Sequence, residues 1–339
     1  MDLDTFLTTV YVWVDDWYKQ NGHAWQRTTG RPCRMSDSEV LTLGIVGQWR
    51  AGVAWRSERG MVRWMHKHGR SWFPQMLQVS AFNARFRQMW SAFARLQQDW
   101  AVLLSQVEDS YEVVDTVPLP AFSLSEGRKA RQRHWLWDSR LGTSRQGWFW
   151  GHRWLVSLLP SGVLTGWTLF PANIQDRWLL QALFSARATG HSHLLTPPPL
   201  HYVKPKRRVH APVYMSGHSL TAGCHHHRPY LADQGFNGSD WLQQWLNQYH
   251  ATVFCLPSAQ STEQDRWSWT AKRWLHSRRQ IIETVFSTLC AVFNIKRLGA
   301  HSTWGQLARL AAIGAAFNLG IACNRTLNRS DLTLETLIC

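Results

Sequence analysis

The period of the hydrophobic pattern changes between residues 105 and 111, and no other feature constrains the fold more. Before this point, apolar residues recur at helical spacing, as Phe6, Val10, Val14 and Trp17 do. After it, short β-rich runs bounded by proline and glycine alternate with helical segments. We therefore expect a small all-helical domain followed by an α/β domain. The expected boundaries are 1–105 for the helical domain, 106–325 for the α/β domain and 326–339 for a C-terminal tail.

The α/β part opens with a buried-strand pattern that runs from Tyr111 to Asp115 and is expected to stop before Pro118 and Pro120. Two β-rich runs joined by a Pro-Ser-Gly turn are expected to form a hairpin. The full order is strand, strand, strand, helix, strand, helix, strand, helix, which gives five strands. The expected ranges after the first strand are 148–159 and 163–170 for the hairpin, 176–188 for a helix and 229–232 for a strand. A helix through Trp241 and Trp245, a strand at 251–256 and a helix at 274–293 complete this order, and a further long helix is expected at 303–323.

The chain is strongly basic, with a formal net charge of +15 at pH 7. Such an excess is larger than solubility requires, and it favours a polyanionic partner, nucleic acid before an anionic membrane surface. The membrane alternative is weaker because we find no signal-peptide pattern and no stretch of about 18 uninterrupted apolar residues. The nearest stretch, residues 307–323, suits a buried core helix. Six scattered cysteines favour a reducing cytoplasm over a disulfide framework.

An arginine-rich stretch lies in the expected helical domain at residues 57–68. Together with a turn and a second helix that starts at Ser80, it resembles a helix-turn-helix arrangement. Arg85 and Arg87 are expected to project from the second helix and to contact DNA. The alternative is that these basic helices serve dimerisation or packing.

Two further basic segments are candidate contacts for nucleic acid. The loop 123–146 combines arginines with Trp135 and Trp137, which suits a nucleic-acid strand, although a solvated loop is the alternative. The segment 189–228 is rich in proline and basic residues and is expected to be an exposed insertion. Its Cys-His-His-His run at 224–227 is not expected to bind zinc, because consecutive loop residues cannot easily surround one ion. The candidate contacts in these segments are Arg128, Lys129, Arg131, Arg133, Lys206 and Arg207.

Three carboxylates stand in contexts that suit a metal site. Asp115 closes the first strand, Asp233 follows a later strand, and Glu283 lies at the edge of a helix's apolar stripe. Metal-dependent phosphodiester chemistry uses two divalent ions about 3.5–4 Å apart, and Mg²⁺ prefers oxygen ligands. Arg279 lies one turn before Glu283, a spacing that permits a helical ion pair. Taken singly, such an aspartate is more often a turn former, and such a pair is more often a surface salt bridge.

Five short blocks, in order along the chain, resemble those of bacterial insertion-sequence transposases of the DDE type. They begin at Asp115 (Asp-Thr-Val-Pro-Leu-Pro), Trp150 (Trp-Gly-His-Arg), Pro171 (Pro-Ala-Asn, with Asp176), Asp233 (Asp-Gln-Gly-Phe) and Arg279 (Arg-Gln-Ile-Ile-Glu-Thr-Val-Phe). The leading stretch from Ser36 (Ser-Asp-Ser-Glu-Val-Leu-Thr-Leu) is similar to the first domain of one such group. The resemblance covers nearly the whole chain.

The resemblance implies an RNase H-like fold, a mixed five-stranded sheet flanked by helices, in which the strands beside Asp115 and Asp233 are parallel neighbours. It implies that Asp115, Asp233 and Glu283 form the catalytic triad and hold two Mg²⁺ ions, with Mn²⁺ as a substitute. It further implies a homo-oligomer, such as a dimer, that acts on double-stranded DNA at the bacterial nucleoid, binding terminal inverted repeats and then cutting and joining strands. Arg153 and Arg279 would contact DNA, and Arg279 would alternatively steady Glu283.

Three positions depart from the family pattern. Related transposases often have a tyrosine, a lysine and a basic residue where this chain has His276, Cys290 and Gln234. Two other functions therefore stay open: a DNA-binding regulator that no longer catalyses, and a nuclease that cuts without joining. Asp176 is expected to be an N-terminal helix residue, favoured by the helix dipole, rather than a further metal ligand.

Overall fold

The structure, a computed structural model, describes residues 1–26, 33–107, 109–122, 124–125, 139–144, 147–189, 214–217, 228–257 and 267–339. The chain forms two units. Unit 1 comprises Met1–Trp100, Thr288–Ala300 and Trp304–Cys339, and unit 2 comprises Ala101–Ser287 and His301–Thr303. The expected boundaries differ from this division, because residues 304–325 and the expected tail belong with the N-terminal helices.

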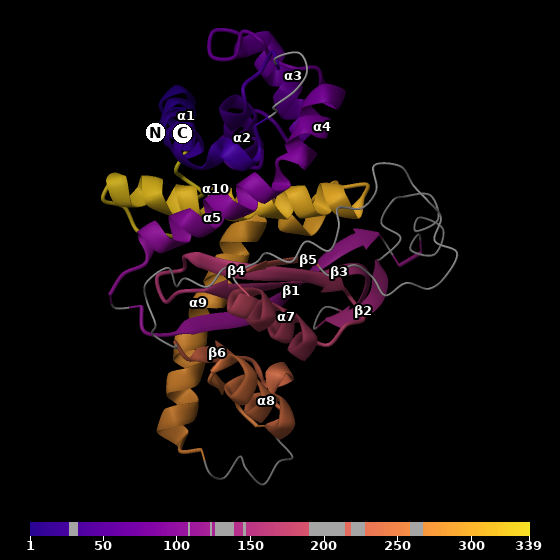
Figure 1. Ribbon diagram of the computed structural model, residues 1–339, viewed down its shortest axis with the longest axis vertical. Helices are drawn as coiled ribbons and strands as arrows, with labels where there is room; N and C mark the ends of the chain where they lie inside the picture. The colour runs from indigo at the N-terminus through magenta and orange to yellow at the C-terminus, as the bar shows by residue number, and fades with distance from the viewer. Residues whose placement is uncertain are drawn as a thin grey trace. The chain divides into compact units, whose positions relative to one another are not determined.

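Unit 1 is helical, as the hydrophobic pattern predicted (Figure 1). Its helix starts follow local rules. The Asp2 carboxylate accepts a hydrogen bond from the Thr5 N–H before α1, and Ser36 and Glu39 form a capping box before α2. The helices that lie wholly or largely in unit 1 are α1 (Leu3–Asn21), α2 (Asp37–Val46), α3 (Glu58–His68), α4 (Val79–Gln88), α5 (Trp90–Leu104) and α10 (Thr303–Thr326).

Helix α10 forms the core of unit 1. Residues on all sides of this helix are buried, which is why its sequence shows little amphipathic pattern. Its Asn318 Nδ2 donates a hydrogen bond to the Gln97 carbonyl of α5 at 3.0 Å, so the one amide in its middle is satisfied. Of the described helices, only α10 is long and apolar enough to cross a membrane, and 94% of its apolar window is buried inside the structure.

Unit 2 contains a mixed sheet of seven strands within the described residues, so the expectation of five strands was wrong. Six strands follow the order β5-β4-β3-β1-β6-β7, and β2 pairs with β3 (Figure 1). The two unpredicted strands, β2 and β5, are short edge strands without an apolar run. The strands are β1 (Glu112–Phe122), β2 (Arg140–Ser144), β3 (Gly147–Leu158), β4 (Leu164–Pro171), β5 (Tyr214–Gly217), β6 (Tyr230–Ala232) and β7 (Val253–Phe254).

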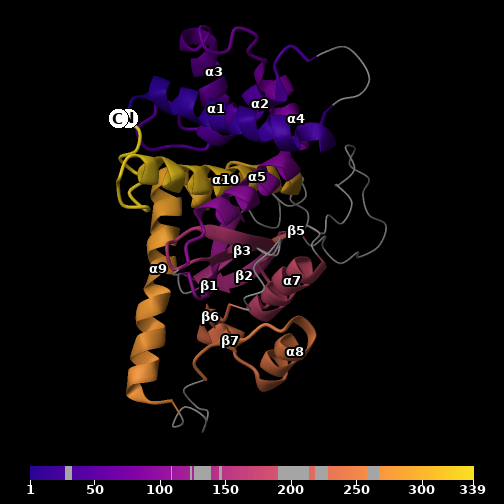
Figure 2. The same cartoon turned by 60° about the vertical axis from the view of Figure 1, so that its left-hand side comes forward.

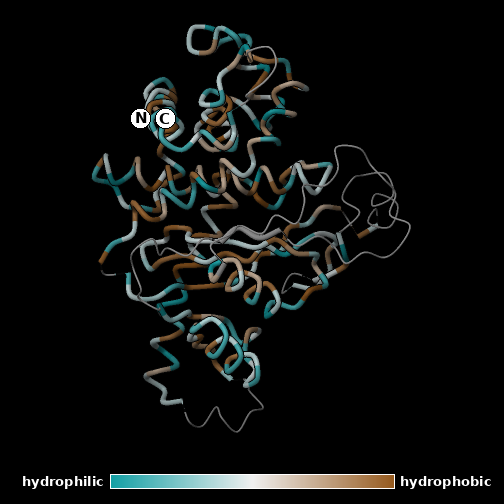
Figure 3. The backbone as a smooth tube through the Cα atoms, viewed as in Figure 1, coloured by the Kyte–Doolittle hydropathy of each residue, from teal (hydrophilic) through white to brown (hydrophobic). Residues whose placement is uncertain are grey.

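Strand β1 continues through Pro118 and Pro120, where the sequence predicted a stop. It pairs in antiparallel fashion with β3 along most of its length, but in parallel with β6 only from Glu112 to Val114. One side of β1 is therefore a sheet edge beyond Asp115, and an edge position tolerates a residue without an N–H donor. The central strands β3 and β4 are largely buried and carry long hydrophobic stretches (Figure 3).

Helices cover both faces of the sheet, and the side chains of β1 show which helix covers which face. Val114 packs in the core cluster with residues of α7 (Asp176–Thr189) and α8 (Ser239–Tyr249). The next residue, Asp115, contacts Arg279 of α9 (Trp269–Phe293). Because successive strand residues point to opposite faces, α9 lies across the face opposite α7 and α8 (Figure 2).

Candidate active site

Asp115 and Asp233 each come directly after the last paired residue of the parallel strands β1 and β6. Val114 of β1 is paired in parallel with Ala232 of β6, so the two aspartates leave this pairing at the same end. Asp233 has extended backbone and precedes a short 3-10 turn at Gln234–Phe236. The expectation that these two strands are parallel neighbours is confirmed.

A cavity of about 210 Å³ brings the three predicted carboxylates together. Asp115, Asp233 and Glu283 all line it, and the helix that supplies Glu283 forms one wall. The residues of α9 in this wall are Leu275, His276, Arg279, Gln280 and Glu283. Four of them, from His276 to Glu283, are spaced by three, one and three residues and so share one helix face. Gln280 was missed in the sequence analysis, although this spacing would have found it.

Arg279 bridges the two aspartates. Its Nη2 lies 3.3 Å from Asp115 Oδ2, and its Nη1 lies 3.1 Å from Asp233 Oδ1. The helical ion pair with Glu283 that the sequence permits is not formed, because the guanidinium is directed at the strand carboxylates. Glu283 is exposed and, within the described part of the chain, has no ion-pair partner.

Asp115 is held in an environment that opposes its charge. Burial raises the pKa of its carboxyl to about 6, and the neighbouring Asp233 and Asp176 carboxylates raise it as well. The Thr116 N–H, which donates to Asp115 Oδ1 at 2.7 Å, and the Arg279 guanidinium lower this pKa, but they do not outweigh burial. Ionisation of the Asp115 carboxyl is therefore less favourable in the folded chain than in water, even beside the Arg279 guanidinium.

The side chains fit divalent cations by donor type, because all three carboxylates supply the oxygen atoms that Mg²⁺ prefers. Nevertheless, among the residues that the structure describes, no three His, Cys, Asp or Glu side chains are grouped so that they could hold one ion. Arg279 lies against both aspartates and supplies the positive charge there.

A second polar group lies at the start of α7, around Asp176. Its carboxylate accepts hydrogen bonds from Thr116 Oγ1 at 3.0 Å and from Arg153 Nη1 at 2.8 Å. The same guanidinium donates to the carbonyls of Ala172 and Thr143 at 3.0 and 2.7 Å. Asp176 is thus the first residue of its helix, as expected. The Arg153 guanidinium is used in holding loop and strand backbone together.

The two predicted DNA contacts on α4 differ in their surroundings. The Arg85 guanidinium contacts the Met35 carbonyl and the Asp37 carboxylate, so it is directed into unit 1 rather than outward. Arg87 instead lines a wide cleft between α3 and α4. The other predicted contacts in the basic loop and the insertion lie outside the described residues, as does the Cys-His-His-His run: Arg128, Lys129, Arg131, Arg133, Lys206, Arg207 and residues 224–227.

The chain was compared with protein-family models, with curated proteins and with solved structures. No family model matches, and neither curated proteins nor solved structures give a significant match. The geometry of unit 2 and the resemblance of its sequence blocks are therefore the grounds on which a function can be proposed.

Proposed function

We propose that this chain is a DDE-type DNA transposase with an RNase H-like catalytic core, which cuts and joins DNA strands at the ends of its mobile element. One observation carries the proposal. Two aspartates at the end of a parallel strand pair line one cavity with a glutamate from a helix that crosses the sheet face. Ligand sites at such strand ends are a general property of open α/β sheets.

Asp115, Asp233 and Glu283 are the residues that would hold two Mg²⁺ or Mn²⁺ ions. Such ions supply charge stabilisation for the attacking and leaving oxygens of a phosphodiester. Arg279 binds the same aspartate oxygens that a cation would use, so it competes with the cation for them. The guanidinium of Arg279 keeps the two carboxylates close to each other despite their mutual repulsion.

The partner in this proposal is double-stranded DNA, both the terminal inverted repeats and the target, bound by a homo-oligomer at the nucleoid. A net charge of +15 supports a polyanionic partner.

The test is strand cleavage by Asp115→Asn, Asp233→Asn and Glu283→Gln in Mg²⁺. Each variant is expected to lose at least about 100-fold in cleavage rate, because even residues that only support metal ligands contribute 10–100-fold. Binding to the terminal repeats is expected to remain. Asp240→Asn is the matched control, because Asp240 is an exposed carboxylate of α8 outside the cavity. Unimpaired nicking by the three cavity variants would overturn the triad.

A second candidate function, a DNA-binding regulator without catalysis, is favoured by the position of Arg279. Both aspartates contact this guanidinium, and within the described residues no third carboxylate is grouped with them so that the three could hold one ion. The arginine therefore offsets the charge of the aspartates without a metal ion. The two candidates differ in one assay. A transposase cuts the element ends and transfers a 3′ hydroxyl to target DNA, whereas the regulator only binds them, and a product that is cut but never joined indicates a nuclease.

A further inference from the structure

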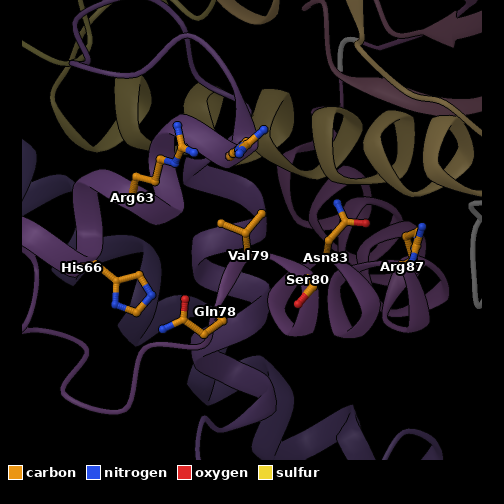
Figure 4. A pocket seen from close by; sticks show the side chains of 8 residues that line it. Arg63, His66, Gln78, Val79, Ser80, Asn83 and Arg87 are labelled. Carbon is orange, nitrogen blue, oxygen red and sulfur yellow. The ribbon is translucent and has the colours of Figure 1, made fainter.

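The cleft between α3 and α4 is lined by two facing polar stripes (Figure 4). Arg59, Arg63 and His66 stand four and three residues apart on α3, and Ser80, Asn83 and Arg87 stand three and four residues apart on α4. Each set therefore occupies one face of its helix. The cleft has a volume of about 830 Å³.

These stripes are not the faces by which the two helices pack into unit 1. Met61 and Met65 of α3 and Phe82 and Phe86 of α4 are buried in the core of the unit. The apolar faces thus hold the helices in place, and the cationic and polar faces remain turned toward each other across the cleft. Two helices that only needed to pack would bring apolar residues to this position.

The positive charge in the cleft is uncompensated. The guanidinium groups of Arg59, Arg63 and Arg87 have no ion-pair partner among the described residues, and the cleft lining contains no carboxylate. Glu58, at the start of α3, is buried and uses its oxygens on Asn83 and Arg309. Neighbouring like charges repel each other, so an anion in this cleft would relieve the repulsion.

The N-terminus of α4 adds to the same field. Gln78 precedes the helix without capping it through its side chain, and both Gln78 and Ser80 line the cleft. The first backbone N–H groups of a helix have no partner within the helix, and they carry the positive end of its dipole. Helix ends of this kind bind phosphate groups, here beside three arginines.

Helix α4 is poorly suited to recognising DNA bases. Its exposed residues are Ser80, Ala81 and Gln88, and Arg85 is directed at Asp37 within the unit. A helix that reads bases in a groove needs several long polar side chains on its outer face. The cationic groups instead lie within the cleft, where an extended phosphate backbone can reach them.

We propose that the α3–α4 cleft binds the phosphodiester backbone of DNA through Arg59, Arg63 and Arg87, without regard to base sequence. This inference rests on the proposed function in one respect, that DNA is the ligand. In this proposal the basic helices hold the duplex by its backbone and do not read base edges.

The test measures the affinity of the full chain for duplex DNA between 50 and 200 mM salt, on element ends and on scrambled sequences. The triple variant Arg59→Ala, Arg63→Ala, Arg87→Ala is expected to reduce the slope of log affinity against log salt by about 2–3, since each phosphate contact contributes about 0.9. The affinity is expected to fall equally for both kinds of sequence. A triple Arg-to-Lys variant, which keeps the charge, is expected to keep the slope.

The matched control is the triple variant Arg34→Ala, Arg56→Ala, Lys67→Ala. These three residues are exposed in the same unit and lie outside the cleft, so the net charge falls by the same amount. The control is expected to keep most of the slope. Thermal unfolding of each variant shows whether it is folded. If the alanine variant is not, the triple variant Arg59→Gln, Arg63→Gln, Arg87→Gln, which removes the same charge but keeps long polar side chains, carries the test with the same expected loss of slope.

The outcomes separate the two proposals. If the unaltered chain binds no duplex at any salt concentration, the proposed function fails. If it binds duplex DNA but the cleft and control variants have the same slope, the cleft inference is wrong and the proposed function stands. A loss confined to element ends would show base reading, and cleft-dependent binding of polyglutamate but not of DNA would show an acidic-peptide site; either result overturns the inference.

Discussion

Ionisation of the Asp115 carboxyl lowers the free energy of unfolding. The pKa of Asp115 is about 6 in the folded chain, against an ordinary value of 3.8, mainly because the carboxyl, whose side chain is 25% exposed, lies largely out of water. The folded state thus holds this proton more tightly than the unfolded state does. Stability is therefore lost as the pH rises from about 4 to about 6, and the loss above this interval is about 3 kcal/mol.

We therefore expect Asp115→Asn to stabilise the fold of unit 2 at pH 8 by up to about 3 kcal/mol, because the amide carries no charge to bury. The difference is expected to disappear below about pH 4, where the carboxyl is protonated in both states. Urea unfolding of both proteins at pH 4 and pH 8 measures it. Equal stability of the two proteins at pH 8 would show that burial of this carboxylate carries no penalty.

Divalent cations provide the control for this prediction. A cation that binds the ionised carboxylate raises the unfolding temperature of the unaltered chain in proportion to its affinity. The same titration with Mg²⁺ is expected to leave Asp115→Asn unchanged. If both proteins respond alike, the cation binds elsewhere.

Single residues were predictable where their role follows from neighbours in the chain. Asp115 and Asp233 stand beside apolar strand patterns, which marked them as candidates, and the resemblance of the sequence blocks implied that their strands are neighbours, as the paired strands β1 and β6 are. The partners of Arg279 could not, because its contacts with these aspartates span 164 and 46 residues. Local spacing suggested only Glu283, four residues away, whereas the strand carboxylates satisfy two donors of the guanidinium at once.

At the scale of elements, α7 is tied to the sheet by a buried ion pair between Glu112 of β1 and Arg187. Arg187 Nη2 lies 2.8 Å from Glu112 Oε2, and the same carboxylate accepts hydrogen bonds from Ser157 and Thr165. Burial alone would raise the pKa of Glu112, but the nearby guanidinium and these hydrogen bonds outweigh it and hold the pKa below the ordinary value of 4.5. The charged pair is therefore the stable form at neutral pH.

Removing one partner of this pair is expected to destabilise the fold by about 3–5 kcal/mol, because the other charge stays buried and unpaired. We expect this from Glu112→Gln and from Arg187→Met, and we expect the double variant to lose less than the sum of the two. Urea unfolding at pH 7 measures all three. The loss from Glu112→Gln is expected to shrink as the pH falls below about 4.5, where Glu112 protonates first in the unfolded chain, and to disappear below the lowered pKa of the folded state. Strictly additive losses would show that the two side chains do not act as a pair.

Elements were predictable in proportion to the apolar area that they bury. The buried strands β3 and β4 and the helices α7 and α9 carry patterns that the sequence shows directly. The edge strands β2 and β5 do not, because a strand paired on one side needs backbone hydrogen bonds rather than an apolar run. The sequence analysis wrongly ended the first strand before the prolines of β1. The effect of a proline depends on whether a neighbouring strand needs the backbone N–H that proline lacks.

At the scale of the whole molecule, the helical unit is built from both ends of the chain. Arg50 donates its backbone N–H to the Val292 carbonyl at 2.7 Å, and the Trp49 and Phe293 rings lie 4.9 Å apart. The core helix α10 contacts α5 through Asn318. Periodicity showed that each of these segments is helical, but it holds no information about which distant segment completes the core. The expected domain 1–105 was therefore drawn without its central helix.

A fragment of residues 1–105 is accordingly not expected to fold on its own. Without α10, the Trp49 ring would lose its packing against Gly320 and Gln97 would lose its contact with Asn318, and an apolar core left open binds dyes such as ANS and unfolds without cooperativity. A chimaera that joins residues 1–100 to residues 288–339 through a flexible linker restores the core helix and is expected to unfold cooperatively. Circular dichroism and ANS fluorescence compare the two.

The chimaera with Asn318→Asp is the control, because a buried charge on α10 facing the Gln97 carbonyl should again loosen the core. A cooperative transition in the short fragment would show that the N-terminal helices close a core without α10, and that the boundary near residue 105 marks an independent domain after all.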